Sequence, residues 1–454
     1  MVECASLLNA DPAVPEVALL TASELASALA GPAPPLVLEA TVGSAFVPAA
    51  VVPGTVTFDI LQLDFVAEDA SGSPLPVTGN YSLRPPAEVR AVLERHGVCA
   101  ARRCVVYTRC RRHTTAARDQ QLRGHHHRYR QAAPREGVAD SIVAARLIWC
   151  MAYAGVERVA LLNGGLSGWQ QLGLPTDNEP TPPTPVGDFF GGRGLSFPRH
   201  PKYYATIDEV AAATSKNTLC VDGSGDPNCE AAPEGASVCD ASSSSVSHGS
   251  LLLGDARARR EFLGEGHDYA YAMPIGRIPG ARFAHWGPST FVGADYHSLK
   301  DGSLRPLDDV ATLWRLAGLL QASADGADAS TETARLVFYC GSGWRSALAW
   351  LIARLLGHPD AASFDGGLFE WGLNPARKVE VGDPSRPGGA MLRPVISQLG
   401  QPAEGSGWHY HARGEEDSYD DGPAGRELQR RRLRAQAASR CAAPSPTNAK
   451  PSGR

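Results

Sequence analysis

The chain of 454 residues is 43% hydrophobic and 20% charged, and it carries a formal net charge of −5. This composition is that of a globular protein with room for two domains of ordinary size. Since no surplus of positive charge is present, we expect neither nucleic acid nor a membrane as a partner. No apolar run reaches the length of a membrane span, and the N-terminus lacks the basic start of a signal or transit peptide.

The ten cysteines are spread along the chain without paired spacing of the CxxC kind. They indicate neither a disulfide framework nor a zinc site, and we expect a reducing compartment, the cytoplasm or, as the alternative, the mitochondrion. The triplet His125, His126 and His127 could bind a metal, but adjacent histidines in a loop are more often solvated. We expect neither a metal site nor a cofactor.

The first half of the chain alternates between the periods of helices and strands. TASELASALA (residues 21–30) predicts a helix, and PPLVLEAT (residues 34–41) predicts the strand that follows it. RRCVVYT (residues 102–108) predicts a second strand, and DSIVAARLIWCMAYAG (residues 140–155) predicts a long apolar helix. This alternation is typical of an α/β domain.

Four segments interrupt the alternation. A basic stretch (residues 109–137), a small polar stretch (residues 223–250) and the tail from residue 383 lack a hydrophobic period, and we expect them to be disordered. Residues 175–203 are rich in proline and glycine, which predicts a linker laid over the surface.

The second half repeats the alternation. ATIDEVAAAT (residues 205–214) predicts a helix, and LLLGDARARREF (residues 251–262) predicts a strand and the next helix. LDDVATLWRLAGLL (residues 307–320) predicts an amphipathic helix before the apolar strand at residues 336–339. After a short loop, leucines at helical spacing predict a helix from Ser346 onward, with glycine and proline as its stop signal.

Three pairs of short motifs recur in the same order in the two halves. They are RRCVVYT with ARLVFYC, LLNGGLSGW with SFDGGLFEW, and VVPGTVTF with GRIPGARF. Ordered self-similarity of this kind indicates two copies of one structural unit. We therefore expect an α/β protein of two tandem domains, residues 15–178 and 200–382, each a mostly parallel sheet flanked by helices, with a disordered C-terminal tail at residues 383–454.

Cys340 lies where the strand at residues 336–339 ends and the next helix begins. Ligands bind at this edge of open α/β sheets, and the unpaired N–H groups and dipole of a helix N-terminus favour a thiolate. Gly341 and Gly343 let the backbone curl around the sulfur, and Arg345 adds a positive charge. We expect a nucleophilic cysteine whose pKa is lowered to roughly 3.5–7.5, the alternative being a buried, inert thiol.

This loop, C-x-x-G-x-R-S, together with the IPGA turn (residues 278–281) and the DGG turn followed by a tryptophan, resembles the two-domain rhodanese-type sulfurtransferases. The resemblance covers roughly residues 21–382 without the two insertions. It implies two rhodanese-like domains, of which the C-terminal one is active and the N-terminal one has lost its cysteine. Thr108 stands where Cys340 stands in the other copy.

The resemblance assigns roles to single residues. Cys340 resembles the sulfur-accepting nucleophile, and Arg345 would grip the anionic donor beside it. The cradle of the persulfide, and with it donor binding, would be formed by Gly341, Ser342, Gly343 and Trp344.

The D-x-R motif, Asp255 and Arg257, resembles the pair that ties down the active loop, and we count Arg257 among the binding residues. In many relatives an arginine that holds the donor stands where this chain has Glu261, so the donor would rely on Arg345 and on Arg259 or Arg260.

The resemblance implies a thiosulfate sulfurtransferase. The Cys340 thiolate would take the outer sulfur of thiosulfate, release sulfite, and pass the persulfide sulfur to cyanide or to a small or protein thiol. 3-Mercaptopyruvate is the alternative donor, which we place second because mercaptopyruvate enzymes show CGSGVT where this loop has Trp344 and Arg345.

Two other classes remain open. Phosphatases on the same scaffold need a C-x5-R loop, whereas only four residues separate Cys340 from Arg345. A rhodanese-like module kept for protein binding is the third possibility, and its support lies in the polar insertions and the charged tail.

Overall fold

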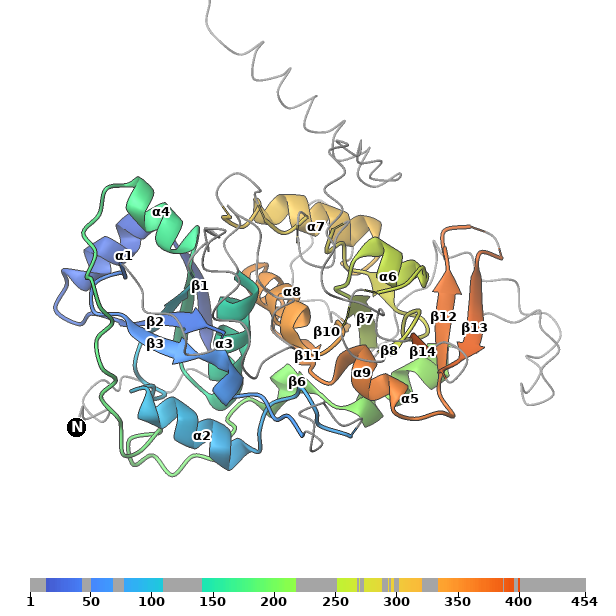
Figure 1. The fold of residues 1–454 in the computed structure, drawn as a ribbon, viewed down its shortest axis with the longest axis horizontal. Helices are drawn as coiled ribbons and strands as arrows, with labels where there is room; N and C mark the ends of the chain where they lie inside the picture. The colour runs from blue at the N-terminus through green and yellow to red at the C-terminus, as the bar shows by residue number, and fades with distance from the viewer. Residues whose placement is uncertain are drawn as a thin grey trace, which may run out of the picture.

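A computed structural model describes the larger part of the chain. The described residues are 14–42, 50–67, 77–108, 141–217, 251–267, 269, 273–287, 293, 295–297, 302–320, 334–386, 388–395 and 399–400. They form two α/β units that lie side by side, each built around a five-stranded sheet (Figure 1).

The first unit has a parallel sheet in the order β1-β5-β4-β2-β3. Its strands are β1 (Glu16–Leu20), β2 (Leu36–Thr41), β3 (Val56–Asp59), β4 (Cys104–Tyr107) and β5 (Arg158–Leu162). Its helices are α1 (Ala22–Leu29), the short η2 (Ile60–Gln62), α2 (Pro86–Arg95), α3 (Ser141–Ala154) and α4 (Gly165–Gln171). The predicted start of α1 is fixed by a capping box, in which Thr21 and Glu24 each accept a hydrogen bond from the other's backbone N–H.

The second unit has a parallel sheet in the order β6-β11-β10-β7-β9. Its strands are β6 (Tyr204–Ala205), β7 (Leu251–Asp255), β9 (Arg282–Phe283), β10 (Arg335–Tyr339) and β11 (Ala361–Phe364). Its helices are η4 (Pro201–Tyr203), α5 (Ile207–Asn217), α6 (Arg259–Leu263), α7 (Leu307–Leu316), α8 (Trp344–Leu355) and α9 (Gly367–Gly372). When strands are numbered within each sheet, the two orders are the same, and the predicted α/β fold of parallel sheets flanked by helices is confirmed.

The two units meet along α3 and α8, which pack against each other between the sheets (Figure 1). Most side chains of both helices are buried, because each helix is covered by its own sheet and by the other helix. Tyr203 joins the helices: its carbonyl accepts from the indole of Trp149 at 2.9 Å, and its ring lies 5.4 Å from that of Trp350.

The prediction of a surface linker at residues 175–203 needs correction. Residues 175–203 do not run only over the surface, since Val186, Phe189, Phe190 and Tyr203 are buried. The proline and glycine content indicated irregular backbone correctly, but the apolar side chains within it supply enough burial to hold the segment on the first unit.

The second unit also continues past the predicted boundary at Gly382. β12 (Lys378–Gly382) pairs antiparallel with β13 (Ala390–Pro394), and the short β14 (Leu399–Gly400) pairs with β8 (Met273–Pro274). Val395 is buried directly after β13. The polar composition of residues 383–395 hid this hairpin, because strand pairing holds it and only Val395 among the described residues of that range is buried. The basic stretch, the polar stretch and residues 401–454 lie outside the described residues.

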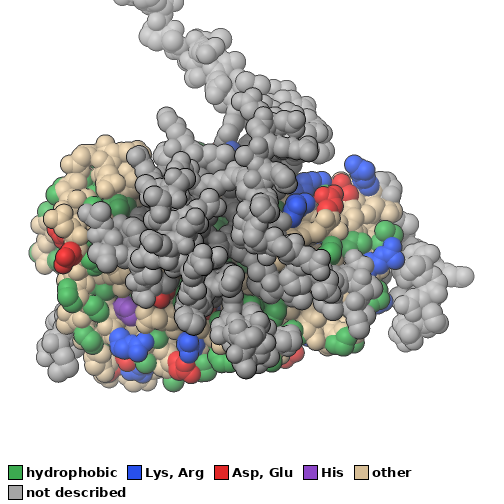
Figure 2. Space-filling model, viewed as in Figure 1, with side chains coloured by type: hydrophobic (Ala, Val, Ile, Leu, Met, Phe, Trp, Pro, Cys, Tyr) green, Lys and Arg blue, Asp and Glu red, His purple; other side chains and the backbone are tan. Residues whose placement is uncertain are grey.

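Within the described residues no helix is long and apolar enough to cross a membrane, and no group of three His, Cys, Asp or Glu could hold a metal ion. Cys104, Cys150 and Cys340 are free and buried, whereas Cys99 is disulfide-bonded, which the cysteine spacing did not indicate. On the face shown in Figure 2, the coloured positive and negative side chains are interspersed.

The hairpin leads to a test of stability. Val395→Ala should lower the free energy of unfolding by about 1–2 kcal/mol, because it removes two buried methyl groups and leaves a cavity. Met391→Ala, at a half-exposed position of the same hairpin, should change it by less than about 0.5 kcal/mol. Urea denaturation of the full chain measures both, and equal effects would contradict the packing of Val395.

Candidate active site

Cys340 directly follows β10, which lies in the middle of the second sheet. β7 pairs with β10 on one side, where Tyr339 is opposite Asp255, and β11 pairs with it on the other. All residues of β10 after Arg335 are buried. The cysteine is therefore delivered to the carboxyl edge of the sheet by a rigid central strand, as the sequence predicted.

The loop after Cys340 wraps around its sulfur. Gly343 has a φ of +83°, and α8 begins directly after it at Trp344, two residues before the predicted start at Ser346. The backbone N–H groups of Ser342, Arg345 and Ser346 donate to the sulfur. The hydroxyl of Ser346 lies beside it and donates to the carbonyl of Gly343 at 2.9 Å. The three N–H groups form the predicted cradle.

The Cys340 thiol is only 2% exposed, and this burial raises its pKa above the ordinary value. The N–H groups of the cradle oppose the shift without reversing it. The expectation of a lowered pKa is therefore wrong for this structure. The sequence showed the donors, but it could not show how completely neighbouring elements exclude water from the sulfur.

The turn after β11 binds the carbonyl groups of the Cys340 loop. The N–H of Leu368 donates to the carbonyl of Cys340 at 2.8 Å, and the N–H of Phe369 donates to that of Gly341 at 3.0 Å. Gly367 comes so close that a Cβ on it would lie 2.6 Å from both carbonyl oxygens. This is the physical reason for the glycine of the DGG motif.

The first unit repeats this geometry around Thr108. Leu166 N–H donates to the carbonyl of Thr108 at 3.2 Å, and Gly165 lies against that carbonyl as Gly367 lies against Cys340. The alignment of Thr108 with Cys340 in the sequence is thus matched in space, with a hydroxyl residue where the second unit has the thiol.

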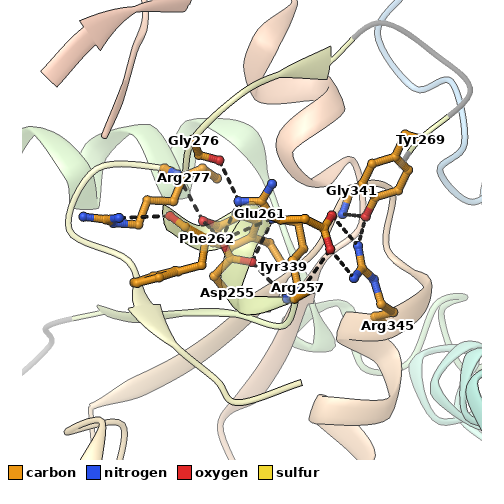
Figure 3. Close-up of polar contacts among 12 residues, drawn as sticks. Asp255, Arg257, Glu261, Phe262, Tyr269, Gly276, Arg277, Tyr339, Gly341 and Arg345 are labelled. Atoms are coloured by element: carbon orange, nitrogen blue, oxygen red, sulfur yellow. Dashed lines mark hydrogen bonds and ion pairs between the residues drawn. The ribbon is translucent and has the colours of Figure 1, made fainter. Parts of the chain in front are cut away.

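Arg345 is held by Glu261, as Figure 3 shows. Its two terminal nitrogens donate to the two carboxylate oxygens of Glu261 at 2.9 and 3.1 Å, and one of them also donates to the hydroxyl of Tyr269. Burial alone would raise the pKa of Glu261, but the Arg345 guanidinium holds it below its usual value. The positive charge expected to face a donor is therefore neutralised within this pair.

Tyr269 closes the loop on the same side. Its hydroxyl accepts the N–H of Gly341 at 3.1 Å, and the ring lies so close that Gly341 has no room for a Cβ. Trp286 is buried in the core, with its ring 5.7 Å from the guanidinium of Arg345. No sequence motif indicated Tyr269, since its contact depends on how a distant segment folds over the loop.

The D-x-R motif anchors the neighbouring turn (Figure 3). Arg257 is buried, and it donates to the carboxylate of Asp255 and, at 2.7 Å, to the carbonyl of Gly276. Tyr339 also donates to Asp255 at 2.8 Å and accepts the N–H of Ile278. Arg257 thus binds Asp255 of β7 and Gly276, which lies just before the IPGA turn, so among the described contacts its role is structural.

The remaining arginines of α6 point outward. Arg260 is exposed, and Arg259 is exposed and pairs with Asp383 at 3.4 Å. The structure therefore brings Gly341, Ser342, Gly343, Trp344 and Arg345 together around Cys340, and it places Arg257 and Arg260 in other surroundings.

The indole of Trp344 reaches the first unit. Its indole nitrogen donates to the carboxylate of Asp64 at 3.0 Å. Arg146 of α3 joins Asp64, at 2.9 Å, to Asp365 of the DGG turn. Only the fold shows that these residues meet, because the sequence separates them by most of the chain.

Comparison with known proteins agrees with this geometry. Residues 243–374 match the family model described as a rhodanese-like domain. The thiosulfate sulfurtransferase YnjE of Escherichia coli is 28% identical over 54% of this chain and 45% of its own length. The 3-mercaptopyruvate sulfurtransferase of the same organism is 24% identical over 52% of this chain and 63% of its own length. The matched region therefore spans less than two thirds of either relative.

A solved structure is similar over a longer range. The anaerobic ergothioneine biosynthesis enzyme of Chlorobium limicola, in complex with its natural substrate trimethyl histidine, has 26% identity and a TM-score of 0.57. The likeness covers 81% of this chain and 70% of that one. The unit that carries Cys340 thus contains the region, residues 243–374, that is similar to the rhodanese-like domain family.

Proposed function

We propose that this protein is a sulfurtransferase that carries sulfur on Cys340 as a persulfide. One observation carries the proposal: three backbone N–H groups converge on the Cys340 sulfur at the start of α8. Such a set of donors stabilises a thiolate or a persulfide anion without a metal or a separate base. The sulfurtransferase names of the relatives support the same reaction class.

The chemistry consists of two displacements at sulfur. In the first, the Cys340 thiolate attacks the outer sulfur of thiosulfate, the S–S bond of thiosulfate breaks, and sulfite leaves with the electron pair. In the second, cyanide or a thiolate attacks the terminal sulfur of the persulfide, and the Cys340 thiolate leaves. Because burial raises the pKa of Cys340, its proton must first pass to solvent.

Thiosulfate is the donor that we favour, because several curated relatives carry that name. Arg345 adds less to this choice than the sequence suggested, since Glu261 neutralises its charge. The backbone N–H groups would hold most of the donor's negative charge. 3-Mercaptopyruvate remains the alternative donor, and a trimethylated histidine joins cyanide and thiols as an acceptor to be tried, given the structural neighbour.

Sulfur loading tests the proposal. Incubation with thiosulfate should add one sulfur to the intact protein, as measured by mass spectrometry, and cyanide should remove it. Cys340→Ser should remain unloaded, because only the nucleophile is changed. Cys104→Ala removes a buried thiol of the first unit and should load like the wild type. Loading of the Cys340→Ser protein, or no loading of the wild type by either donor, would contradict the proposal.

The pH dependence tests the raised pKa of Cys340. A thiol below its pKa gains thiolate about tenfold per pH unit, so alkylation of Cys340 by iodoacetamide should keep accelerating from about pH 6 to about pH 8.5. Peptide mass analysis would locate the label. A rate that becomes constant below about pH 8 would show that the cradle outweighs burial after all.

Removing the countercharge of Arg345 tests how the donor is held. Glu261→Gln keeps the shape of the side chain but leaves the guanidinium uncompensated, so the KM for thiosulfate should fall about threefold or more. Glu265→Gln makes the same charge change at an exposed site of the same segment and should leave KM unchanged. An unchanged KM in Glu261→Gln would mean that Arg345 does not face the donor.

A further inference from the structure

We infer that the first unit takes part in sulfur transfer through Asp64, a positioning residue that holds Trp344 and thereby fixes the cradle around Cys340. The inference rests on the proposed function, because it concerns the loop that would carry the sulfur. Asp64 follows η2 in the first unit, while Trp344 is the first residue of α8 in the second.

The contact is buried and directional. Asp64 is 2% exposed, and one of its carboxylate oxygens accepts from the Trp344 indole at 3.0 Å. The other accepts from Arg146 at 2.9 Å. Hydrogen bonds to a charged acceptor are stronger than neutral ones, so this carboxylate fixes the rotamer of the indole.

Asp64 is held in place by Arg146, which has further partners of its own. Arg146 also donates to both oxygens of Asp365, which accepts the backbone N–H of Leu83 of the first unit at 2.7 Å. Arg146 and Asp365 have no exposed side-chain surface. Two units thus share one buried group of two carboxylates and one guanidinium.

This group lies against the turn that forms the cradle. A Cβ on Gly343 would collide with Asp365, and it would lie 2.9 Å from a guanidinium nitrogen of Arg146. Trp344 stands between Gly343 and Arg345, whose N–H donates to the sulfur. A shift of Trp344 would therefore move two of the cradle's donors, those of Arg345 and Ser346, because all three residues share the first turn of α8.

The charges of the group also predict a response to pH. Burial raises the pKa of Asp64 to about 6, while Arg146 opposes the shift and Asp365 adds to it. The thiol of Cys150 on α3 lies within electrostatic reach of the same carboxylates. Below about pH 6 the protonated Asp64 is a weaker acceptor for the indole of Trp344.

The experiment compares Asp64→Asn, Trp344→Phe and the double variant in the full chain, with the rate of sulfur loading from thiosulfate as the measurement. Each single variant should load about tenfold more slowly, because a small misplacement of reacting groups is costly. The double variant should be no slower than either single one, since both remove the same contact. Asp360→Asn removes an exposed ion pair with Lys202 within the second unit and should load normally.

A spectroscopic readout separates positioning from a general loss of structure. The indole N–H signal of Trp344, assigned by its absence in Trp344→Phe, should shift with a midpoint near pH 6 in the wild type and should not titrate in Asp64→Asn. Trp344→Phe carries the test alone if Asp64→Asn does not fold.

Wild-type loading rates in both single variants, or slowing in the double variant by the product of the two single effects, would overturn the inference while leaving the proposed function intact. Absence of loading in the wild type would reject the proposed function and the inference together.

Discussion

The structure depends on one constraint, which is that a sulfur atom must be held among backbone N–H groups at a place that water scarcely reaches. The N–H donors of the Cys340 loop favour an anion there, while burial of the thiol opposes its ionisation. Both act on the pKa of Cys340, which burial raises and the N–H groups lower, and the net shift is upward. Under the proposed function, the same N–H groups would stabilise the persulfide of Cys340 as an anion.

The loop has no regular hydrogen-bonding pattern of its own, so its shape is imposed by its neighbours. The DGG turn binds the carbonyls of Cys340 and Gly341, and Tyr269 binds an N–H on the other side of Gly341. Arg345 is tied to α6 by Glu261, and Trp344 is tied to the first unit by Asp64. Each support comes from a different element, and so the cradle is preorganised before any substrate arrives.

Local features of this protein could be predicted from its sequence, and distant ones could not. The strand before Cys340, the helix after it and the glycines between them follow from periodicity and from the conformational freedom of glycine. The direction of Arg345 does not, because Glu261 competes with any donor for the guanidinium and only the fold brings the two together. The burial of Phe189 in the expected linker could not be predicted either, because it depends on contacts with distant residues. The hairpin beyond Gly382 was likewise missed, because its polar composition gave no sign that it pairs with β12.

Two equivalent hydrogen bonds connect the units, one in each direction, and they differ in the charge of the acceptor. The backbone N–H of Leu304 in the second unit donates to Asn163 of the first, while that of Leu83 in the first donates to Asp365 of the second. Both donors stand in an SLRP segment, and both acceptors stand in an x-G-G turn. The neutral amide needs no countercharge, whereas the buried carboxylate needs Arg146. The charged version occurs on the side that carries the cysteine, where it continues through Asp64 to Trp344. The first unit, which has Thr108 at the position of Cys340, thereby contacts the loop that carries the cysteine.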